Sequence, residues 1–405
     1  MNFPELHPPL TSQAAVAEAN RCLFCFDAPC AAACPTHIDV PRFIKKIATG
    51  NLLGSAETII DANVLGLSCS RVCPVEVLCE GACVYHNISG QPITIGLLQR
   101  HAMEHFYASS GKLPNKTVAT AKRVACIGAG PASLACAAEL RKHGLNVTIF
   151  DKRPQPGGLN TYGVAQYKFT PSDSAREVEL VRATGVEFRS AVAIGKDLSI
   201  DDLEKEFDAI FIGIGLGSTQ PLGIPGEHAS HVVNALDFIA AYKHAEPMHV
   251  GQCVAVIGGG NTAIDAAVAA KYLGAAHVSI LYRRAEANMS AFTFEYEHAR
   301  RAGINFVWNA RPIAFTANAV ECDNGETIPA QTVIVAIGQS RLLETLCKIR
   351  TIELRNGQVV VNPQTGQTAD PKYFAGGDCV NGGREVVDAA AEGKRAAQGI
   401  LKWLT

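Results

Sequence analysis

The sequence lacks several features that mark large classes of protein. It has no excess of basic residues, because 36 lysines and arginines stand against 38 acidic residues and the formal net charge is -2. A nucleic-acid binder needs a basic field to neutralise phosphates, so we expect no nucleic-acid partner. No apolar run approaches the roughly 18 residues that cross a membrane, and the start, MNFPELHPPL, is unlike a signal peptide. We therefore expect a cytoplasmic protein without a membrane partner.

Cysteine is sparse outside one region. The chain has 14 cysteines, and eight of them lie between Cys22 and Cys83, which favours metal ligation over disulfides. The other cysteines form no C-x-x-C pair, which disfavours a disulfide reductase of the thioredoxin-reductase type. We interpret them as small buried hydrophobic residues; they are Cys126, Cys136, Cys253, Cys322, Cys347 and Cys379.

The clustered cysteines fall into two groups, each with a Cys-Pro pair. The first group has the spacing C-x2-C-x4-C-x3-C-P, which differs from the bacterial ferredoxin run only before its third cysteine, and in that run the fourth cysteine ligates the other cluster. Eight thiolates suffice for two [4Fe-4S] clusters, whereas structural zinc remains the competing interpretation. The groups are Cys22, Cys25, Cys30 and Cys34, followed by Cys69, Cys73, Cys79 and Cys83.

A glycine turn follows the first clear strand of the chain, RVACIG. Gly128 and Gly130 allow the backbone to turn tightly and approach a pyrophosphate, while Pro131 and Ala132 begin the next helix. Asp151 ends the second strand, where an acid accepts hydrogen bonds from a ribose diol. The segment predicts a dinucleotide-binding unit.

The same plan recurs in CVAVIGGGNTAIDAAVAAKYLGAAHVSILYRR, which predicts a second dinucleotide unit. The tip of its second strand carries two arginines in place of an acid. Guanidinium groups there favour the 2′-phosphate of NADPH, although Glu286 and a solvated surface pair leave NADH open. The predicted contacts are Gly258, Gly260, Asn261, Thr262, Arg283 and Arg284.

Two further glycine-rich segments accompany the first unit. The pair Gly157-Gly158, followed by Leu159, lets the backbone approach a flat ring system closely. Near the C-terminus, Gly377 and Asp378 stand between a short apolar strand and a helix, where the acid can bind a hydroxyl group of the ligand. Both segments predict cofactor contacts.

Six segments in order resemble the family of two-cluster flavoprotein reductases, which includes the glutamate synthase small subunit and the N-terminal half of dihydropyrimidine dehydrogenase. They are CLFCFDAPCAAACPTHIDV, LGLSCSRVCPVEVLCEGAC, VACIGAGPASL, PGGLNTYGV, VAVIGGGNTAIDAA and YFAGGDCV. The resemblance implies an α/β protein with an N-terminal α-helical iron–sulfur domain (1–118) and two Rossmann-like domains. The FAD-binding domain comprises 119–230 and 338–405, and the NAD(P)H-binding domain comprises 231–337.

The resemblance also implies ligands for two clusters. One cluster is held by Cys22, Cys25, Cys30 and Cys83, and the other by Cys34, Cys73, Cys79 and Gln99. An amide oxygen is a poor ligand in general, and a count of thiolates selects Cys69 in place of Gln99. The resemblance places FAD in the first unit and NADH or NADPH in the second, and it requires no catalytic acid or base, because placement of the nicotinamide against the flavin performs the hydride transfer.

These assignments predict a reductase subunit that passes electrons from NAD(P)H through FAD and two [4Fe-4S] clusters. The predicted domains leave no room for a second flavin barrel of about 250 residues, so we expect the substrate to be reduced on another subunit. The resemblance implies that this partner is an FMN-bearing catalytic subunit, in a hetero-oligomer that reduces uracil or thymine. One alternative is the glutamate synthase small subunit, which serves a glutaminase-type partner. Another is a zinc-stabilised nucleotide-binding scaffold without turnover.

Overall fold

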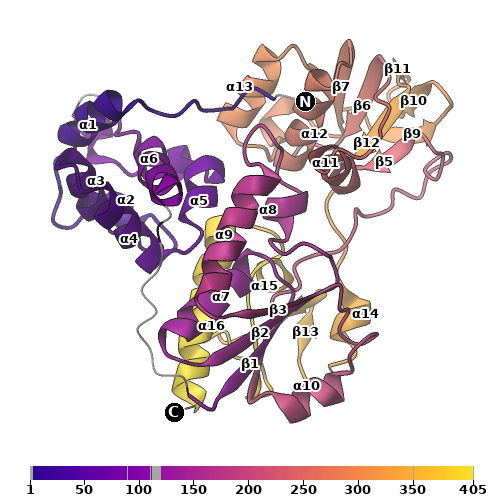
Figure 1. The fold of residues 1–405 in the computed structure, drawn as a ribbon. Coiled ribbons are helices and arrows are strands. Elements are labelled where there is room, and N and C mark those ends of the chain that lie inside the picture. The colour runs from indigo at the N-terminus through magenta and orange to yellow at the C-terminus, as the bar shows by residue number, and fades with distance from the viewer. Residues whose placement is uncertain (1–2, 89, 110, 112–119, 350, 405) are drawn as a thin grey trace. The chain divides into compact units, whose positions relative to one another are not determined.

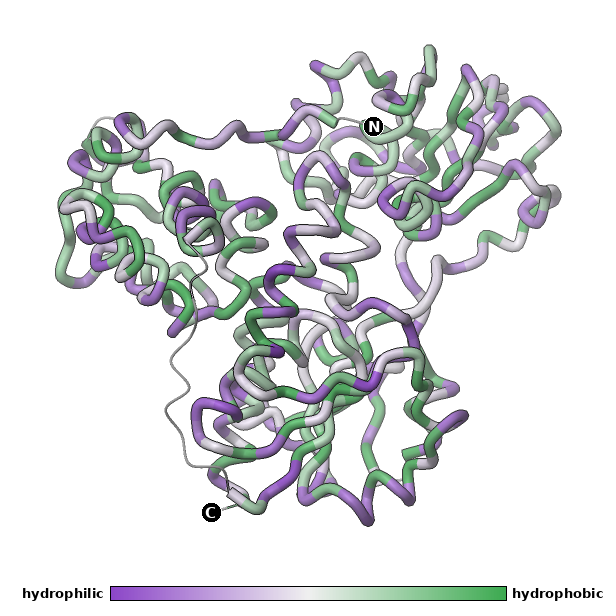
Figure 2. The backbone as a smooth tube through the Cα atoms, viewed as in Figure 1, coloured by the Kyte–Doolittle hydropathy of each residue, from purple (hydrophilic) through white to green (hydrophobic). Residues whose placement is uncertain are grey.

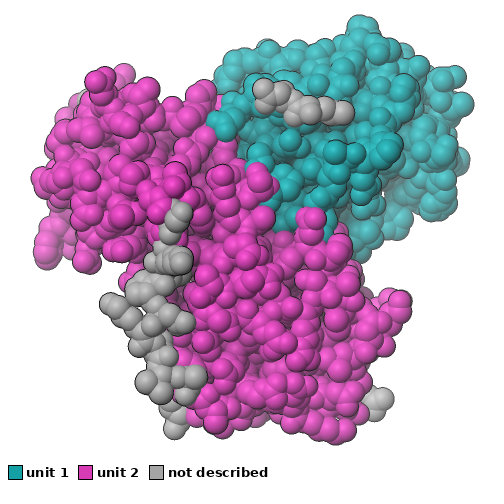
Figure 3. Space-filling model, in the orientation of Figure 1, with its two compact units in different colours: residues 1–5, 161–171, 217–340 teal, residues 6–160, 172–216, 341–405 magenta. Residues whose placement is uncertain are grey.

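The structure is a computed structural model that describes residues 3–88, 90–109, 111, 120–349 and 351–404. The chain divides into two units, each assembled from separate stretches of sequence (Figure 3). Unit 1 contains residues 1–5, 161–171 and 217–340, and unit 2 contains residues 6–160, 172–216 and 341–405. Most of the predicted linker, 109–122, lies outside the described residues. In the described ranges, every helix is too short or too polar to pass through a lipid bilayer.

Unit 2 begins with a helical domain, as the sequence predicts. Polar caps begin three of its helices: Thr11 accepts a hydrogen bond from the Ala14 N–H, Asp39 from the Arg42 N–H, and Asn51 from the Gly54 N–H. Segments without regular structure connect the helices and carry most of the clustered cysteines. The helices are α1 (Ser12–Arg21), α2 (Pro29–Ala32), α3 (Val40–Ala48), α4 (Leu52–Ala62), α5 (Gly66–Val72), η1 (Val75–Val77), η2 (Val84–Asn87) and α6 (Ile95–Ala108).

The second part of unit 2 is a five-stranded parallel sheet in the order β15-β4-β1-β2-β3, and Figure 1 labels its strands β1, β2 and β3. The central strand β1 (Arg123–Ile127) pairs in register with both neighbours, so that Ile127 lies opposite Phe150 and Ile212. Hydrophobic side chains occupy nearly every position of the central strands, as a sheet covered on both faces requires (Figure 2). The other strands are β2 (Asn146–Asp151), β3 (Glu187–Ser190), β4 (Ala209–Ile212) and β15 (Tyr373–Ala375).

Helices cover this sheet. The long C-terminal helix α16 (Val386–Leu404) packs along α7 (Pro131–Lys142). The approach is close, because a Cβ atom added to Gly393 of α16 would lie 2.0 Å from the Ala132 carbonyl oxygen of α7. The remaining elements of unit 2 are α9 (Pro171–Ala183), α10 (Ile200–Glu206), α14 (Leu343–Leu346), α15 (Asp378–Asn381), and the strands β13 (Leu354–Arg355) and β14 (Gln358–Val359).

Unit 1 contains the second parallel sheet, in the order β5-β12-β6-β7-β8. Its core lies between this sheet and a small antiparallel sheet of β9, β10 and β11. The strands are β5 (Val232–Asn234), β6 (Cys253–Ile257), β7 (His277–Tyr282), β8 (Asn305–Trp308), β9 (Pro312–Phe315), β10 (Ala319–Cys322), β11 (Thr327–Pro329) and β12 (Thr332–Val335). The helices are α11 (Ala235–Lys243), α12 (Asn261–Tyr272), η3 (Glu286–Asn288) and α13 (Thr293–Arg301).

One segment of unit 1 interrupts the sequence of unit 2. Residues 161–171 begin within the short helix α8 (Leu159–Tyr162) and end at the first residue of α9. Tyr167 and Phe169 of this segment are fully buried. The chain therefore passes from the predicted flavin contacts into unit 1 and back before it forms α9. Sequence reasoning had assigned these residues, with the rest of 119–230, to the FAD-binding domain.

Candidate functional site

The first cysteine set comprises Cys22, Cys25, Cys30 and Cys83, and these residues line one small cavity in the helical domain. The thiols influence one another: burial and then the neighbouring Cys22 raise the pKa of Cys30 to about 11. Burial and then Cys25 and Cys83 likewise raise the pKa of Cys22, against a backbone hydrogen bond. A metal cation would offset this repulsion and displace the protons, so the donor set fits an iron–sulfur cluster or zinc.

The loop that carries this set is held in an uncommon conformation. Phe24, between Cys22 and Cys25, has a backbone φ of +50°, which residues other than glycine rarely adopt. The ammonium group of Lys45 lies 4.5 Å from the centre of the Phe24 ring. The Tyr85 hydroxyl donates to the Arg21 carbonyl at 2.6 Å, which connects the segment after Cys83 to the end of α1. The protein itself therefore determines the shape of the cavity.

The second cysteine set comprises Cys34, Cys69, Cys73 and Cys79. A hydrogen bond from Cys69, burial, and the neighbouring Cys79 and Cys34 all raise the pKa of Cys73. Burial, then Glu80 and Cys34, raise the pKa of Cys79. In the described part of the chain, no three histidine, cysteine or acidic side chains converge as around a single ion.

Two residues compete for the fourth position of the second set. Cys69 is buried in α5, accepts a hydrogen bond from the Asn63 side-chain nitrogen at 3.2 Å, and contacts Cys73. Gln99 is buried in α6 and donates its Nε2 to the Gly66 carbonyl at 2.7 Å. That bond uses the amide nitrogen and leaves the amide oxygen for a ligand. Both residues reach α5, and both remain candidate ligands.

The first glycine turn connects β1 to α7 and has no space for side chains. Gly128 has a φ of +93°, and an added Cβ would lie 2.5 Å from the Gly213 carbonyl oxygen. A Cβ added to Gly158 would lie 2.7 Å from the Gly130 Cα, and one added to Gly377 would lie 3.0 Å from the Ala132 Cβ. The structure therefore brings together three glycine segments that the sequence separates by up to 249 positions, 377 minus 128.

Two acidic residues near the first glycine turn, Asp151 and Asp378, have different surroundings. Asp151 accepts the Ala129 N–H at 2.6 Å through one carboxylate oxygen and the Arg153 N–H at 2.7 Å through the other. Asp378 begins α15, and burial raises its pKa against a hydrogen bond from the Arg384 N–H. The Asp151 carboxylate thus shapes the turn, and its further lone pairs can accept ribose hydroxyl groups.

The second glycine turn connects β6 to α12 in unit 1. Gly258 has a φ of +147°, and an added Cβ would lie 2.3 Å from the Ala336 carbonyl oxygen. The Asn261 side-chain oxygen accepts the Phe292 N–H at 3.0 Å, so this side chain orders the loop before α13. Thr262 follows in the first turn of α12. The free N–H groups of such a turn bind a pyrophosphate.

The strand tip beside this turn is basic. Arg283 and Arg284 are both exposed, and no ion pair involves either guanidinium in the described ranges of the chain. Glu286 accepts a hydrogen bond from the Tyr296 hydroxyl at 2.6 Å. Glu286 is therefore hydrogen-bonded to Tyr296, and the two arginines present positive charge to solvent. A 2′-phosphate on adenosine, as in NADPH, would pair with such a charge.

Sequence reasoning missed a buried ionic cluster in unit 1. Lys168 pairs with Asp265 of α12 at 2.6 Å and with Glu295 of α13, and the Tyr167 hydroxyl donates to Asp265 at 2.9 Å. Burial lowers the Lys168 pKa, but Asp265 and Glu295 more than offset this effect and raise it to about 12. The one signal in the sequence is an acid in the otherwise apolar stretch NTAIDAAVAA.

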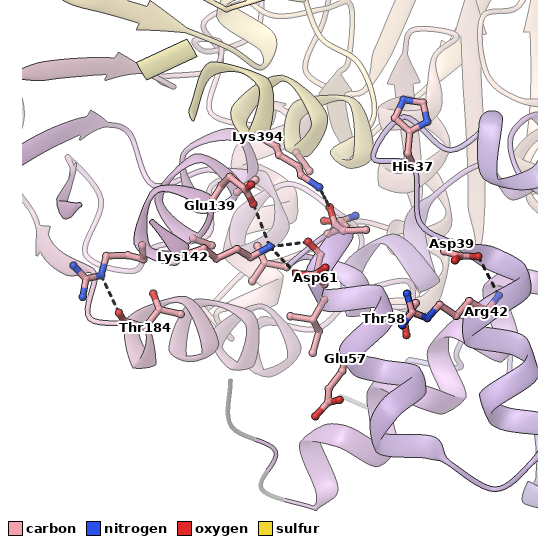
Figure 4. A pocket seen from close by; sticks show the side chains of 18 of the residues that line it. His37, Asp39, Arg42, Glu57, Thr58, Asp61, Glu139, Lys142, Thr184 and Lys394 are labelled. Carbon is pink, nitrogen blue, oxygen red and sulfur yellow. Dashed lines mark hydrogen bonds and ion pairs between the residues drawn. The ribbon is translucent and has the colours of Figure 1, made fainter. Parts of the chain in front are cut away.

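A further cavity is lined by none of the predicted site residues. It has a volume of about 680 Å³ and lies in unit 2 between the helical domain and helices α7 and α16 (Figure 4). Lys142 bridges its walls, with contacts to the Asp61 carbonyl at 2.6 Å and to Glu139 at 3.1 Å. Lys394 donates to the Ala62 carbonyl at 3.1 Å. These bonds attach the helical domain to the first dinucleotide domain.

Comparison with known families accounts for most of the chain. Residues 1–110 match the family described as dihydropyrimidine dehydrogenase domain II, 4Fe-4S cluster, and residues 122–393 match the pyridine nucleotide-disulphide oxidoreductases. The chain therefore belongs to the pyridine nucleotide-disulphide oxidoreductase family and carries an N-terminal 4Fe-4S domain. Iron–sulfur, flavin and NAD(P)H chemistry follow from the two domains, as does the predicted oxidoreductase activity.

Individual relatives share nearly the full length of the chain. The glutamate synthase [NADPH] small chain of Escherichia coli is 34% identical over 100% of this chain and 94% of its own length. The NAD-dependent dihydropyrimidine dehydrogenase subunit PreT of Salmonella typhimurium is 36% identical over 99% of this chain and 97% of its own. Both names describe one component of a multi-subunit enzyme.

Solved structures support the fold of the two dinucleotide domains. Thioredoxin reductase of T. acidophilum has a TM-score of 0.58 at 18% identity and covers 69% of this chain and 97% of its own. FprA of Mycobacterium tuberculosis in complex with NADPH has the same TM-score at 18% identity, over 70% and 84%. The predicted fold class, a helical iron–sulfur domain followed by two Rossmann-like domains, is confirmed.

Proposed function

We propose that this chain is the electron-input subunit of a dihydropyrimidine dehydrogenase. It would oxidise NAD(P)H, hold FAD and two [4Fe-4S] clusters, and deliver electrons to an FMN-bearing catalytic subunit that reduces uracil or thymine. The observation that carries the proposal is the union, in one chain, of two cysteine sets with two dinucleotide turns. The near full-length similarity to PreT supports the choice of substrate.

Each part of the chain has a separate task in this proposal. Backbone N–H groups at the turns of Gly128 and Gly258 bind the two pyrophosphates. Asp151 and Asp378 hold the flavin nucleotide, while Arg283 and Arg284 receive the adenosine end of the reductant. When bound, the flavin supplies the conversion of a hydride into single electrons. No side chain need transfer a proton, because the protein contributes placement.

Support for a redox partner comes from the surface of the cysteine loops. Phe26, one residue after Cys25, is 100% exposed, and Leu23, Val77 and Ile88 are 51%, 61% and 68% exposed. All four lie within five residues of a clustered cysteine in the sequence, and exposed apolar side chains are candidates for an interaction surface. A partner that buries them would lie over the cysteine sets, where electrons leave the chain.

The glutamate synthase small subunit is the second candidate function. The E. coli relative of that name matches 94% of its length, and the second strand tip, LYRRAEANM, favours NADPH as the reductant. The partner would then be a glutaminase-type subunit. Co-purification of the untagged partner distinguishes the two functions, because the proposal expects an FMN-containing subunit and uracil-dependent oxidation of NADH or NADPH.

Anaerobic purification tests the cofactors. We expect about eight irons and one FAD per chain, since each of two clusters contains four irons, and bleaching of the visible spectrum by a nicotinamide. Zinc in place of iron would support the scaffold alternative. The disputed ligand is tested in the same assay, because Gln99→Ala should remove one cluster and Cys69→Ala should retain both. The reverse result would assign the site to Cys69.

A further inference from the structure

Helix α5 carries Cys69 and ends immediately before Cys73, yet its first turn is capped from another domain. Its N-cap residue, Leu65, has no side chain that accepts a hydrogen bond. The Ser68 N–H instead donates to Glu177 Oε1 at 2.8 Å. Glu177 lies 109 residues further along the chain, in α9, which precedes strand β3 of the first parallel sheet. The carboxylate thus satisfies an N–H group that a helix start leaves open.

The same helix is held near its other end. Arg71 pairs with Asp173 at 2.7 Å, and the two side chains are only 7% and 9% exposed. Asp173 and Glu177 are four residues apart on α9 and therefore lie on one face. Ser68 and Arg71 are three residues apart on α5 and share a face for the same reason. Two buried acidic side chains of α9 therefore contact α5 at two points, the Ser68 N–H and the Arg71 guanidinium.

Packing stability alone does not explain this arrangement. Glu177 is 1% exposed, and its Oε2 has no hydrogen-bond partner in the described chain. Burial raises its pKa to about 8, against the hydrogen bonds from Ser68 and Leu67. A buried polar atom left without a partner costs free energy, and a hydrophobic side chain at such a site is often neutral or stabilising. The two acidic residues therefore determine the position of α5 and add little to the stability of its packing.

We propose that Asp173 and Glu177 are positioning residues that hold α5, and with it the second cysteine set, at a set distance from the flavin. The role rests on the proposed function, in which electrons pass from the first dinucleotide domain to the cysteine sets. Electron transfer slows steeply with distance, so a small shift of α5 alters the rate without any change in the cofactors. The reduction of flavin by NAD(P)H needs neither residue.

The test uses the full chain, purified anaerobically with its cofactors. Glu177→Leu should expose the Leu67 and Ser68 amides to faster hydrogen exchange and alter the electron paramagnetic resonance signal of one cluster only. In single-turnover mixing with NAD(P)H, flavin reduction should stay at the wild-type rate. Transfer from flavin to cluster should slow severalfold, because the rate of electron transfer falls steeply as the distance between the two cofactors grows.

Conservative variants separate positioning from folding. Glu177→Gln keeps an oxygen for the Ser68 N–H, so we expect near wild-type exchange and transfer, and Asp173→Asn should give a partial effect. Glu179→Gln is the matched control, because Glu179 lies on α9, is 64% exposed, and pairs with Arg182. If Glu177→Leu folds and leaves the exchange, the signal and the transfer rate unchanged, the positioning role is wrong. If it does not fold, near wild-type exchange and transfer in Glu177→Gln together with partly slowed transfer in Asp173→Asn support the positioning role, whereas loss of amide protection and slowed transfer in Glu177→Gln overturn it.

Failure of the proposed function gives a different result. A wild-type protein without iron, or with flavin that NAD(P)H does not reduce, overturns the electron path and this role with it. Normal flavin reduction and normal clusters, with no response to Glu177→Leu, overturn only the role of α9.

Discussion

The glycine turns of the two dinucleotide domains have the same backbone contact, but the tips of the second strands carry opposite charges. In both, the first glycine of the turn faces a carbonyl oxygen that follows the neighbouring strand: Gly213 after β4 for Gly128, and Ala336 after β12 for Gly258. The backbone therefore forms the same cradle twice. At the strand tips, Asp151 is engaged by two backbone N–H groups, whereas Arg283 and Arg284 are exposed. In the proposed function, the charges rather than the backbone of the turn would therefore select each nucleotide.

The helices that follow the turns also differ. Helix α7 presents small neutral residues, and Ser133 lies against Gly213 with a buried hydroxyl that has no hydrogen-bond partner in the described chain. Helix α12 places Asp265 at a similar depth and pairs it with Lys168 of the segment 161–171. Unit 1 thus contains a buried ionic cluster, Lys168 with Asp265 and Glu295, that holds the segment 161–171. We call this cluster the anchor, and its segment lies between two stretches of unit 2 in the sequence.

Removal of that anchor should have the largest effect on stability. Lys168→Met leaves Asp265 and Glu295 buried without their cation, and breaking a buried pair in this way costs about 3–5 kcal/mol. Denaturant unfolding of the intact protein measures the loss. Lys271→Met is the control, because Lys271 lies on α12 with Asp265 and its ammonium group donates to the carbonyl of the exposed residue Ala276. Equal stability of the two variants would contradict the anchor.

The Lys168 contribution should also depend on pH in a defined direction. Its folded-state pKa is raised to about 12 from an ordinary value of 10.5. The stabilisation is therefore fully present below pH 10.5 and is lost as the pH rises through 12. Between neutral pH and pH 10, wild type and Lys168→Met should keep a constant difference in free energy of unfolding.

Substitution of the turn glycines should separate the two sites. Gly128→Ala and Gly258→Ala each force a Cβ against a backbone carbonyl and retain a positive φ, which costs roughly 1–3 kcal/mol before the clash is counted. We expect the first variant to lose flavin absorbance and the second to keep it but resist reduction by NAD(P)H. Gly50→Ala and Gly274→Ala are controls with positive φ and no atom within 4 Å. Loss of flavin in the Gly258 variant would contradict the assignment.

The arginine tip should determine the choice of reductant. Arg283→Ala with Arg284→Ala removes charge-assisted contacts to a 2′-phosphate, so KM for NADPH should rise about 10-fold to 100-fold while KM for NADH changes little. Steady-state kinetics with both nucleotides measures this. Arg301→Ala, which removes a 69% exposed arginine of the same unit, is the control. Equal effects on both nucleotides would show that the tip does not read the phosphate.

The sequence predicts those parts of the molecule that local patterns determine. The strands that precede Gly128 and Gly258, the helices after them, and the Cys22–Cys25–Cys30 spacing are all readable within about 35 residues, which is the length of one βαβ unit. Lys168 and Glu177 are not readable in this way, because their partners lie 97 and 109 positions away. The choice between Cys69 and Gln99 also depends on tertiary structure, since both residues meet at α5.

Asp151→Asn should have the smallest effect and tests the other strand tip. The two carboxylate oxygens accept separate backbone N–H groups, and an amide has only one oxygen, so the variant loses about one hydrogen bond, or ~1 kcal/mol. Flavin binding should weaken about fivefold. Asp197→Asn is the control, because that exposed carboxylate also accepts a backbone N–H, from Ala193 at 2.8 Å. A loss of flavin as complete as in Gly128→Ala would mean that Asp151 contacts the cofactor more extensively than the turn, so that charge contributes as much to the first site as the arginines do to the second.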